Sequence, residues 1–155
     1  MITTPERFNI RVYGLLIDEQ KRVLVSDEYI RGNYFTKFPG GGLELGEGTR
    51  DCLIREFMEE TGLTISVDKH LYTTDFYQQS AFNRSDQIIS IYYTVSCSDL
   101  SGLKTSAIPF DLSEEITSNP KGTGESFRWI EWSDFNADSV RLPIDKIVAI
   151  LLKET

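Results

Sequence analysis

The sequence predicts an α/β fold, an α/β/α sandwich in which a mixed β-sheet lies between two helices. Segments with the alternating or β-rich composition of strands recur along the chain, mainly at residues 8–17, 22–27, 87–97 and 126–132. Two amphipathic helical patterns accompany them, one at residues 49–61 and one that begins at Pro143. A chain of 155 residues is normally one domain, so residues 1–155 are expected to form a single domain.

The N-terminal part begins with two strand-like segments joined by a turn. Residues 8–17 (FNIRVYGLLI) precede the polar residues 18–21, and a second strand is expected near residues 22–27. Because the intervening turn is short, this pattern predicts a β-hairpin. Residues 28–37 are polar and aromatic, and we interpret them as a connection to a glycine-rich loop at residues 38–42.

The helix expected at residues 49–61 has recognisable ends. Thr49 can cap its N-terminus, since a hydroxyl accepts a hydrogen bond from a backbone N–H that lacks a partner in the first turn. Gly62 stands where a left-handed C-terminal cap is expected. An ordinary surface helix does not need a glycine loop directly before it, so the loop and the helix together indicate a site.

Three carboxylates of this helix, Glu56, Glu59 and Glu60, fall within roughly a 100° arc. The opposite side is expected to carry the apolar residues Leu53, Ile54, Phe57 and Met58. Like charges four residues apart disfavour a helix by about 0.2–0.5 kcal/mol per pair. Hard divalent cations prefer oxygen ligands, so the three acids are candidate ligands of Mg²⁺ or Mn²⁺. A solvated acidic surface is the alternative.

The rest of the chain alternates between β-rich segments and loops. The longest strand candidate is 87–97, and β-rich composition also marks residues 63–67, 71–77 and 126–132. Residues 78–86 are interpreted as a polar loop. Residues 98–124 contain several glycines and prolines and form a long irregular segment of a kind that is often functional. Pro143 suits the first turn of a final helix with an apolar stripe.

The composition limits the classes of function. The net charge of −8 argues against binding a long nucleic acid, which requires clustered Lys and Arg, but not against a small phosphorylated substrate bound through metal ions. No apolar run approaches the roughly 18 residues of a membrane span, and the N-terminus lacks the pattern of a signal peptide. Cys52 and Cys97 are expected to be free thiols. We therefore expect a cytoplasmic protein without membrane association.

Residues 41–63 (GGLELGEGTRDCLIREFMEETGL) carry a longer pattern than the acids alone. The pattern is Gly-x5-Glu-x7-Arg-Glu-bulky-x-Glu-Glu-x-Gly-bulky, and its nine fixed positions are occupied by Gly41, Glu47, Arg55, Glu56, Phe57, Glu59, Glu60, Gly62 and Leu63. All of them agree with the signature of the Nudix hydrolases, so the chain resembles this family. We call this segment the Nudix box; outside it the resemblance is looser.

The resemblance implies the same α/β/α fold and a metal-dependent hydrolase that acts on a nucleoside diphosphate derivative. In the family the matching glutamates hold the catalytic metals, which implies Glu56, Glu59 and Glu60 as ligands, together with the backbone carbonyl of Gly40. The metals would lower the pKa of a bound water that attacks phosphorus and splits a diphosphate linkage. Glu56 is the first choice for the base that accepts its proton. Arg55 is expected to orient the glutamates through an ion pair.

Candidates outside the Nudix box rest on weaker signals. A further glutamate from a loop is common in the family, and Glu125 is the first choice, with Glu114 and Glu115 as alternatives. Five residues near strand ends and the glycine loop could contact phosphate or base, namely Arg11, Tyr13, Arg31, Tyr34 and Lys37. Of these, Arg11, Tyr34 and Lys37 are the predicted substrate residues. All of these residues are also compatible with ordinary strand, loop or surface positions.

The main alternative function is a non-catalytic Nudix-like domain that binds a nucleotide or acts as a regulatory module. Degenerate box glutamates would favour it, and none is degenerate here. A structural Ca²⁺ module would show the alternating ligands of an EF-hand loop, which the sequence lacks. The sequence leaves open whether the substrate is a nucleoside triphosphate, a nucleotide sugar or a similar compound, and whether the protein forms a homodimer.

Overall fold

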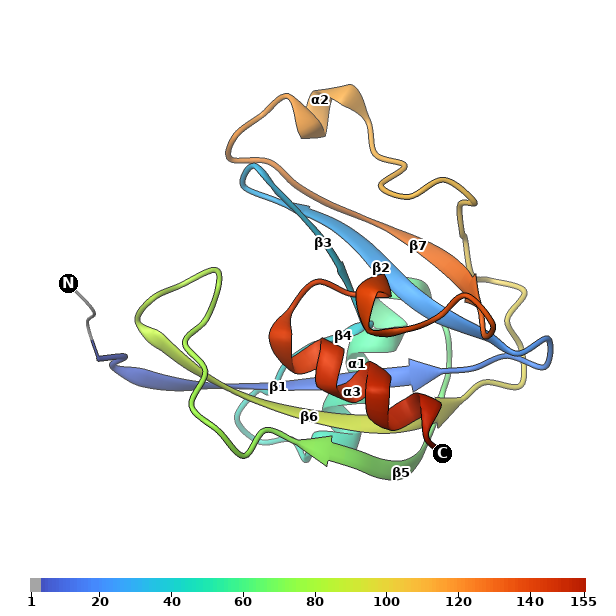
Figure 1. Ribbon diagram of the computed structural model, residues 1–155, viewed down its shortest axis with the longest axis horizontal. Helices are drawn as coiled ribbons and strands as arrows, with labels where there is room; N and C mark the ends of the chain where they lie inside the picture. Colours follow the sequence, from blue (N-terminus) through green and yellow to red (C-terminus); the bar gives the residue numbers. More distant parts are fainter. Residues whose placement is uncertain (1–3) are drawn as a thin grey trace.

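The computed structural model describes residues 4–155, and its strands form two sheets, one in the lower and one in the upper half of Figure 1. The first sheet has the strand order β4-β1-β6-β5 and the second has the order β3-β2-β7. The strands are β1 (Arg7–Leu16), β2 (Arg22–Ile30), β3 (Asn33–Lys37), β4 (Gly40–Gly42), β5 (Ser66–Thr73), β6 (Asp86–Ser96) and β7 (Thr123–Glu131). The helices are α1 (Thr49–Thr61), α2 (Glu114–Thr117) and α3 (Pro143–Lys153), with a 3₁₀ turn η1 (Ala137–Ser139).

The first sheet is mixed. β1 and β6 run parallel along their length, from Arg7 opposite Asp86 to Leu16 opposite Val95. A parallel pair needs a long crossover connection, and here the chain passes through β2 to β5 and α1 between the two strands. β4 and β5 run antiparallel to their neighbours. The pairing of β4 with β1 fixes the glycine-rich loop at one edge of this sheet.

Side chains of β1 alternate between two hydrophobic cores, one on each face of the first sheet. Val12 and Leu16 pack in one core with Phe57 of α1, whereas Tyr13 and Leu15 pack in the other core with buried residues of α3. Successive residues of a strand point to opposite faces, so α1 and α3 cover opposite faces of the sheet. Figure 1 shows α3 in front of it and α1 behind. The predicted sandwich of a mixed sheet between two helices is confirmed.

The second sheet corrects two expectations. The turn at residues 18–21 forms, but β1 and β2 share only one isolated bridge and then enter different sheets, so the predicted hairpin between them is wrong. Residues 28–37 are not a connection; they contain the end of β2, a short turn and β3, which pairs antiparallel with β2. Phe35 of β3 is buried, which accounts for aromatic residues in this otherwise polar segment.

α1 spans the predicted residues, but its N-terminal cap differs. The N-cap is Gly48, whose backbone N–H donates to the Asp51 carboxylate at 3.1 Å. The Thr49 hydroxyl instead forms a hydrogen bond with the Tyr93 hydroxyl at 2.7 Å, so the prediction that Thr49 caps the helix is wrong. Gly62 ends the helix in the left-handed conformation, with a φ of 74°, as predicted.

The apolar face predicted for α1 is only partly correct. Leu53 and Phe57 are fully buried, but Ile54 and Met58 are 40% and 47% exposed. The helix packs along β4, β1 and β5, which cover only a narrow stripe of its surface. The apolar underside therefore consists of fewer residues than the sequence pattern indicates.

The remaining elements mostly follow the prediction. The sequence predicted two β-rich segments at residues 63–67 and 71–77, whereas the structure has one strand there, β5. The pairing of β5 with β6 is irregular, with shifts of register along the strand. Within residues 4–155, β6 is the longest strand, and α3 begins at Pro143 as expected. The irregular segment 98–124 contains the short α2 and leads into β7.

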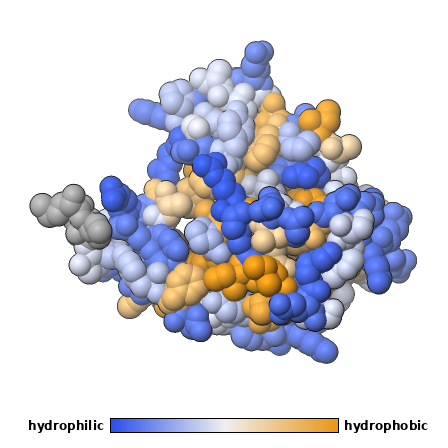
Figure 2. Space-filling view, in the orientation of Figure 1, coloured by the Kyte–Doolittle hydropathy of each residue, from blue (hydrophilic) through white to orange (hydrophobic). Residues whose placement is uncertain are grey.

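Hydrophilic side chains cover most of the face in Figure 2, and hydrophobic side chains gather over α3. Ile150 of α3 is 50% exposed. Within residues 4–155, no helix is long and apolar enough to cross a membrane.

Candidate active site

The Nudix box folds into β4, the following loop and α1, and β4 and α1 approach each other closely. Glu56 of α1 lies directly over Gly41: a Cβ atom added to Gly41 would stand 2.4 Å from the carboxyl carbon of Glu56. Gly40 has a φ of 150°, and a Cβ there would stand 2.1 Å from the carbonyl oxygen of Val12. Both positions therefore require glycine. The structure thus brings the backbone of β4, which contains the predicted carbonyl ligand, next to the Glu56 carboxylate.

Arg55 contacts the acidic side chains of the box. Its guanidinium donates to both carboxylate oxygens of Glu47, at 2.7 and 3.0 Å, and to the carbonyl oxygen of Gly42 at 3.1 Å. It also donates to Glu56 at 3.0 Å and to Glu59 at 3.2 Å. One arginine thus joins three glutamates from the loop and the helix, which is the geometry that a positioning role requires.

The ion pair with Arg55 keeps Glu47 charged. Hydrogen bonds from Arg55, and then one from the backbone N–H of Glu44, lower the pKa of Glu47 to about 2. In return, the hydrogen bonds to Glu47 raise the pKa of Arg55 above its usual range. Glu47 is therefore a fixed anion that anchors Arg55.

A second set of carboxylates comes together from α1, β2 and β7. We call it the carboxylate group; it consists of Glu28, Glu56, Glu60 and Glu125, and Glu28 lies opposite Glu125 in the pairing of β2 with β7. Burial, and then the negative charges of Glu125, Glu56 and Glu28, raise the pKa of Glu60 to about 8. Burial, and then Glu28, raise the pKa of Glu125 to about 6. The group holds more negative charge than the folded chain neutralises.

The carboxylate group has the chemistry that a hard divalent cation requires. Its donors are carboxylate oxygens, and a cation would relieve the repulsion that raises the pKa of Glu60. Within residues 4–155, no three acidic, His or Cys side chains already stand at metal-binding spacing, so the side chains would have to turn toward an ion. The side chain of Glu56 is 14% exposed, whereas that of Glu59 is 58% exposed. Both carboxylates accept a hydrogen bond from Nη1 of Arg55, so Glu56 and Glu59 lie on one side of α1, with Glu59 at its more exposed edge.

The structure distinguishes Glu125 from the two alternatives on α2. Glu125 and Glu60 line a cavity of about 450 Å³, whose wall also includes residues 102–106. Glu114 and Glu115 are exposed and line neither this cavity nor the one described next. Glu125 is therefore the acid outside the Nudix box that joins the box glutamates, together with Glu28.

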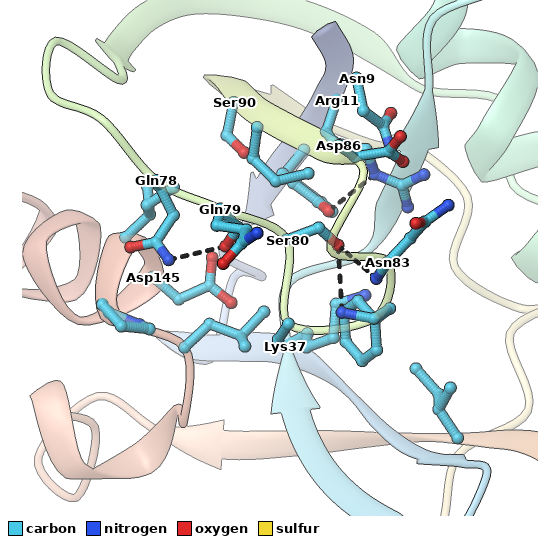
Figure 3. Close-up of a pocket in the computed structure, with 18 of the residues that line it drawn as sticks. Asn9, Arg11, Lys37, Gln78, Gln79, Ser80, Asn83, Asp86, Ser90 and Asp145 are labelled. Carbon is cyan, nitrogen blue, oxygen red and sulfur yellow. Dashed lines mark hydrogen bonds between the residues drawn. The ribbon is translucent and has the colours of Figure 1, made fainter. Parts of the chain in front are cut away.

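A cavity of about 280 Å³ lies between the two sheets (Figure 3), and we call it the first cavity. Arg11 of β1 and Lys37 of β3, two of the predicted substrate residues, both line it. Lys37 is 5% exposed, and its ammonium group lies 3.5 Å from Glu28 of the carboxylate group. The guanidinium of Arg11 lies beside Gly42 of β4. Arg11 therefore connects the first cavity to the Nudix box, and Lys37 connects it to the carboxylate group.

The loop that contains residues 78–83 forms one side of the first cavity. The Ser80 hydroxyl accepts hydrogen bonds from the backbone N–H groups of Phe82 and Asn83, at 3.0 and 3.1 Å (Figure 3). The ring of Phe82 packs edge-on against Phe35 of β3, with 4.9 Å between the ring centroids. The loop joins two strands of the first sheet but rests on the second, so it bridges both walls of the cavity.

The NUDIX domain family matches residues 7–149, which is most of the chain. The chain belongs to the Nudix family. A MutT-like protein from Streptomyces ambofaciens is 34% identical over 67 residues. That match spans 43% of this Nudix chain and 42% of the relative.

Solved Nudix structures share the fold at low sequence identity. A NUDIX hydrolase from Nitrosomonas europaea has a TM-score of 0.66 at 17% identity, and the match covers 95% of this chain and 89% of that one. A MutT protein from Methanosarcina mazei Go1 has a TM-score of 0.66 at 16% identity, with 98% of each chain covered. The predicted Nudix fold is confirmed, and family membership indicates the enzyme class of Nudix pyrophosphohydrolases.

Tyr34, the third predicted substrate residue of this Nudix protein, lies away from both cavities. It is 42% exposed and packs edge-on against Tyr29 and Phe110. Residues three apart on a strand point to opposite faces, so Tyr34 lies on the face of β3 opposite Lys37. The structure brings Arg11 and Lys37 together and leaves Tyr34 out.

Three acidic residues outside the predicted set, Glu28, Asp86 and Asp145, also line the first cavity. The carboxylate of Asp86 accepts hydrogen bonds from Arg7 and Asn9. Glu28 carries no local signal in the sequence, because its neighbour Glu125 comes from a distant strand. Asp145 does carry one: it is 2% exposed and stands on the apolar stripe of α3 beside Ile144 and Val148, where an acid is unexpected.

Proposed function

We propose that this Nudix protein is a metal-dependent pyrophosphohydrolase that cleaves the diphosphate linkage of a nucleoside diphosphate derivative. The proposal is carried by the carboxylate group, in which burial and then the neighbouring negative charges raise the pKa of Glu60 to about 8, beside a cavity lined by Arg11 and Lys37. A cation and a phosphorylated ligand would together neutralise both sets of charges. The intact Nudix box favours an enzyme over a non-catalytic nucleotide-binding or regulatory domain.

The proposed ligands of Mg²⁺ or Mn²⁺ are Glu56 and Glu60, with Glu59 at the outer edge and the backbone carbonyl of Gly40. When bound, the ion would supply positive charge to the diphosphate and lower the pKa of the attacking water. The chain itself provides orientation. Arg55 holds Glu56 and Glu59 by hydrogen bonds at 3.0 and 3.2 Å, so their carboxylates are positioned before substrate binds.

The first cavity is proposed to bind the nucleoside part of the substrate. Its volume of about 280 Å³ is near the lower end of the roughly 300–1,000 Å³ typical of ligand pockets, which suits one nucleoside and not two. Arg11 and Lys37 are proposed to bind phosphate oxygens where the cavity meets the Nudix box. A nucleoside triphosphate and a nucleotide sugar both satisfy this arrangement, because the group beyond the diphosphate lies outside the cavity.

The proposed bond changes need one proton acceptor. A P–O bond forms from the water oxygen, the bridging P–O bond of the diphosphate breaks, and the leaving group departs as a phosphate anion or ester. The water proton passes to a carboxylate of the chain. Glu56 is the first choice, and Glu125 is the alternative because it belongs to the same carboxylate group.

The test is hydrolysis of nucleoside triphosphates, nucleotide sugars, ADP-ribose and dinucleoside polyphosphates with Mg²⁺ or Mn²⁺, followed by release of phosphate or pyrophosphate. Glu56→Gln and Glu60→Gln are expected to lose turnover while they keep metal-independent nucleotide binding. Glu114→Gln, at an exposed acid on α2, is the matched control and is expected to remain active. Nucleotide binding without turnover of any substrate by the unmodified protein would support the non-catalytic alternative instead.

A homodimer, a cytoplasmic location and a single domain over residues 1–155 stay predictions. Sedimentation equilibrium of the purified protein would distinguish a monomer from a homodimer.

A further inference from the structure

The cavity of about 450 Å³ beside Glu60 and Glu125 is larger than the first cavity, and we call it the second cavity. It lies between the end of α1, the edge strand β7 and residues 102–106 of the segment that leads to α2 (Figure 1). Asp111 of the same segment also lines it. The nucleoside proposed above occupies the first cavity, so the second cavity is left without an assigned ligand.

Hydrogen bonds hold the segment that lines the second cavity against the second sheet. The backbone N–H of Ser106 donates to the carbonyl oxygen of Phe127 in β7 at 2.8 Å. The backbone N–H of Phe110 donates to the carboxylate of Asp27 at 3.3 Å. Asp27 is fully buried and also accepts two hydrogen bonds from Arg128, at 2.7 and 2.9 Å. This wall is therefore formed before a ligand binds, which lowers the entropy that binding costs.

The carboxylate group borders both cavities. Glu28 lines the first cavity, whereas Glu60 and Glu125 line the second. Glu28 lies opposite Glu125 in the pairing of β2 with β7, so the same group of acids connects the two spaces. A ligand with its nucleoside in the first cavity and its diphosphate at these acids therefore extends into the second cavity with the group beyond the diphosphate.

The charges that line the second cavity disfavour a further phosphate. Among residues 4–155, Lys104 is the one cation of the lining, against the three acids Glu60, Asp111 and Glu125. A divalent cation held by the carboxylate group would offset Glu60 and Glu125 and leave Lys104 beside the charge of Asp111. A terminal phosphate would then be repelled by Asp111, whereas a neutral group would not.

The hydrogen-bonding groups of the lining complement hydroxyl groups. The Ser106 hydroxyl donates to Oδ2 of Asp111 at 2.8 Å, and within residues 4–155 no side chain or backbone group donates to Oδ1. A carboxylate only accepts hydrogen bonds and an ammonium group only donates them, but a hydroxyl does both. A ligand with several hydroxyl groups therefore satisfies Asp111 and Lys104 together. The volume of about 450 Å³ is within the range of ligand pockets and has room for a sugar ring.

We propose that the second cavity binds the sugar of a nucleotide sugar, whose hydroxyl groups form hydrogen bonds with Asp111 and Lys104. The inference rests on the proposed function, because that function places the diphosphate at the carboxylate group. It narrows the substrate class to nucleoside diphosphates that carry a neutral, polyhydroxylated group in place of a terminal phosphate.

The test compares the binding of matched ligands to the metal-free protein in EDTA by NMR titration. Three pairs share a nucleoside diphosphate and differ in the group beyond it: UDP-glucose and UTP, GDP-mannose and GTP, and ADP-ribose and ATP. We expect at least one pair in which the nucleotide sugar binds about tenfold more tightly, the effect of one hydrogen bond to a charged group. The absence of a preference in every pair would overturn the proposal, and so would a failure of all the probes to bind.

Asp111→Ala separates the hydrogen bond from the lower charge of the nucleotide sugar. It removes an acceptor of the sugar hydroxyls, so the affinity for the nucleotide sugar is expected to fall about tenfold. The affinity for the triphosphate is not expected to fall, because a negative charge is lost. Asp134→Ala removes an exposed acid that lines neither cavity, and it is expected to keep the preference. Thermal unfolding of each variant would verify that it is folded.

Gly102→Trp fills the second cavity and leaves Asp111 in place. The φ of Gly102 is not positive, and a Cβ there meets no atom within 4 Å, so the backbone accepts a side chain. The bulk is expected to weaken binding of the nucleotide sugar about tenfold and to spare the smaller triphosphate. Ala107→Trp, at an exposed residue of the same segment outside the lining, is the matched control. Equal effects of Gly102→Trp on both ligands, or none, would contradict the proposal.

The sugar site and the proposed function fail separately. Hydrolysis of nucleotides in Mg²⁺ by a protein whose preference Asp111→Ala and Gly102→Trp leave unchanged would overturn the sugar site and support the enzyme. A preference that both substitutions remove, in a protein without hydrolysis in Mg²⁺, would overturn the proposed enzyme and leave the sugar site supported.

Discussion

Glu60→Gln is expected to stabilise the metal-free protein. Folding raises the pKa of Glu60 from 4.5 to about 8, so the folded state holds a proton that the unfolded chain releases above pH 4.5. Stability is therefore lost as the pH rises from 4.5 toward 8. At roughly 1.36 kcal/mol per pH unit, the loss at pH 7 amounts to at most about 3.4 kcal/mol. Glutamine carries no charge, so the variant avoids this loss.

Urea denaturation in EDTA at pH 4 and pH 7 measures the effect. The gain in the free energy of unfolding from Glu60→Gln should be close to zero at pH 4 and 1–3 kcal/mol, on the order of the upper limit above, at pH 7. Glu114→Gln, at an exposed acid, should show no such pH dependence. An equal change at both pH values would refute the reasoning, because the effect would then not come from the charge of Glu60.

Magnesium provides the second half of this test. Cation binding would let Glu60 ionise, so the unmodified protein should gain more stability from Mg²⁺ than Glu60→Gln does. A ligand at 100 times its Kd adds about 2.7 kcal/mol to the free energy of unfolding. Equal gains in both proteins would show that Glu60 is not a metal ligand.

Three further changes test the site. Gly41→Ala places a Cβ 2.4 Å from the carboxyl carbon of Glu56, and displacing that carboxylate should lower kcat/KM about 100-fold. Steady-state hydrolysis measures this effect, and unchanged kinetics would contradict the close packing. Arg55→Lys cannot reproduce the paired hydrogen bonds to Glu47, so a higher Mg²⁺ concentration for half-maximal activity is expected, and an unchanged one would count against positioning by Arg55. Asp145→Asn should raise the free energy of unfolding by up to about 3 kcal/mol at pH 8 and have little effect at pH 3.5, because the pKa of Asp145 rises from 3.8 to about 6 on folding. Urea denaturation measures both changes, and equal changes at the two pH values would contradict this reasoning.

The Nudix box could be predicted from the sequence because its contacts are local. Arg55 reaches Glu56 and Glu59 on its own helix and Glu47 in the preceding loop. Helical spacing and the ends of a helix follow from short-range rules. The sequence of this short segment therefore determines where these residues lie relative to one another.

The features that could not be predicted from the sequence depend on how elements far apart in the chain pair and pack. Glu28 joins the carboxylate group only because β2 pairs with β7, and that register depends on the whole second sheet. Tyr34 and Lys37 were both candidates, but the orientation of β3 places only Lys37 in the first cavity. Ile54 and Met58 remain exposed because the strands under α1 cover a narrower stripe than helical periodicity alone predicts.

The two ends of the proposed substrate site share one physical feature, which is burial of acids whose charge the folded chain does not fully neutralise. Burial raises the pKa of Glu60 near the Nudix box and that of Asp145 at the start of α3. Each acid therefore weakens the ligand-free fold as the pH rises, and a divalent cation would relieve the strain at Glu60. Since a ligand that binds only the folded state stabilises it, Mg²⁺ should raise the free energy of unfolding through Glu60.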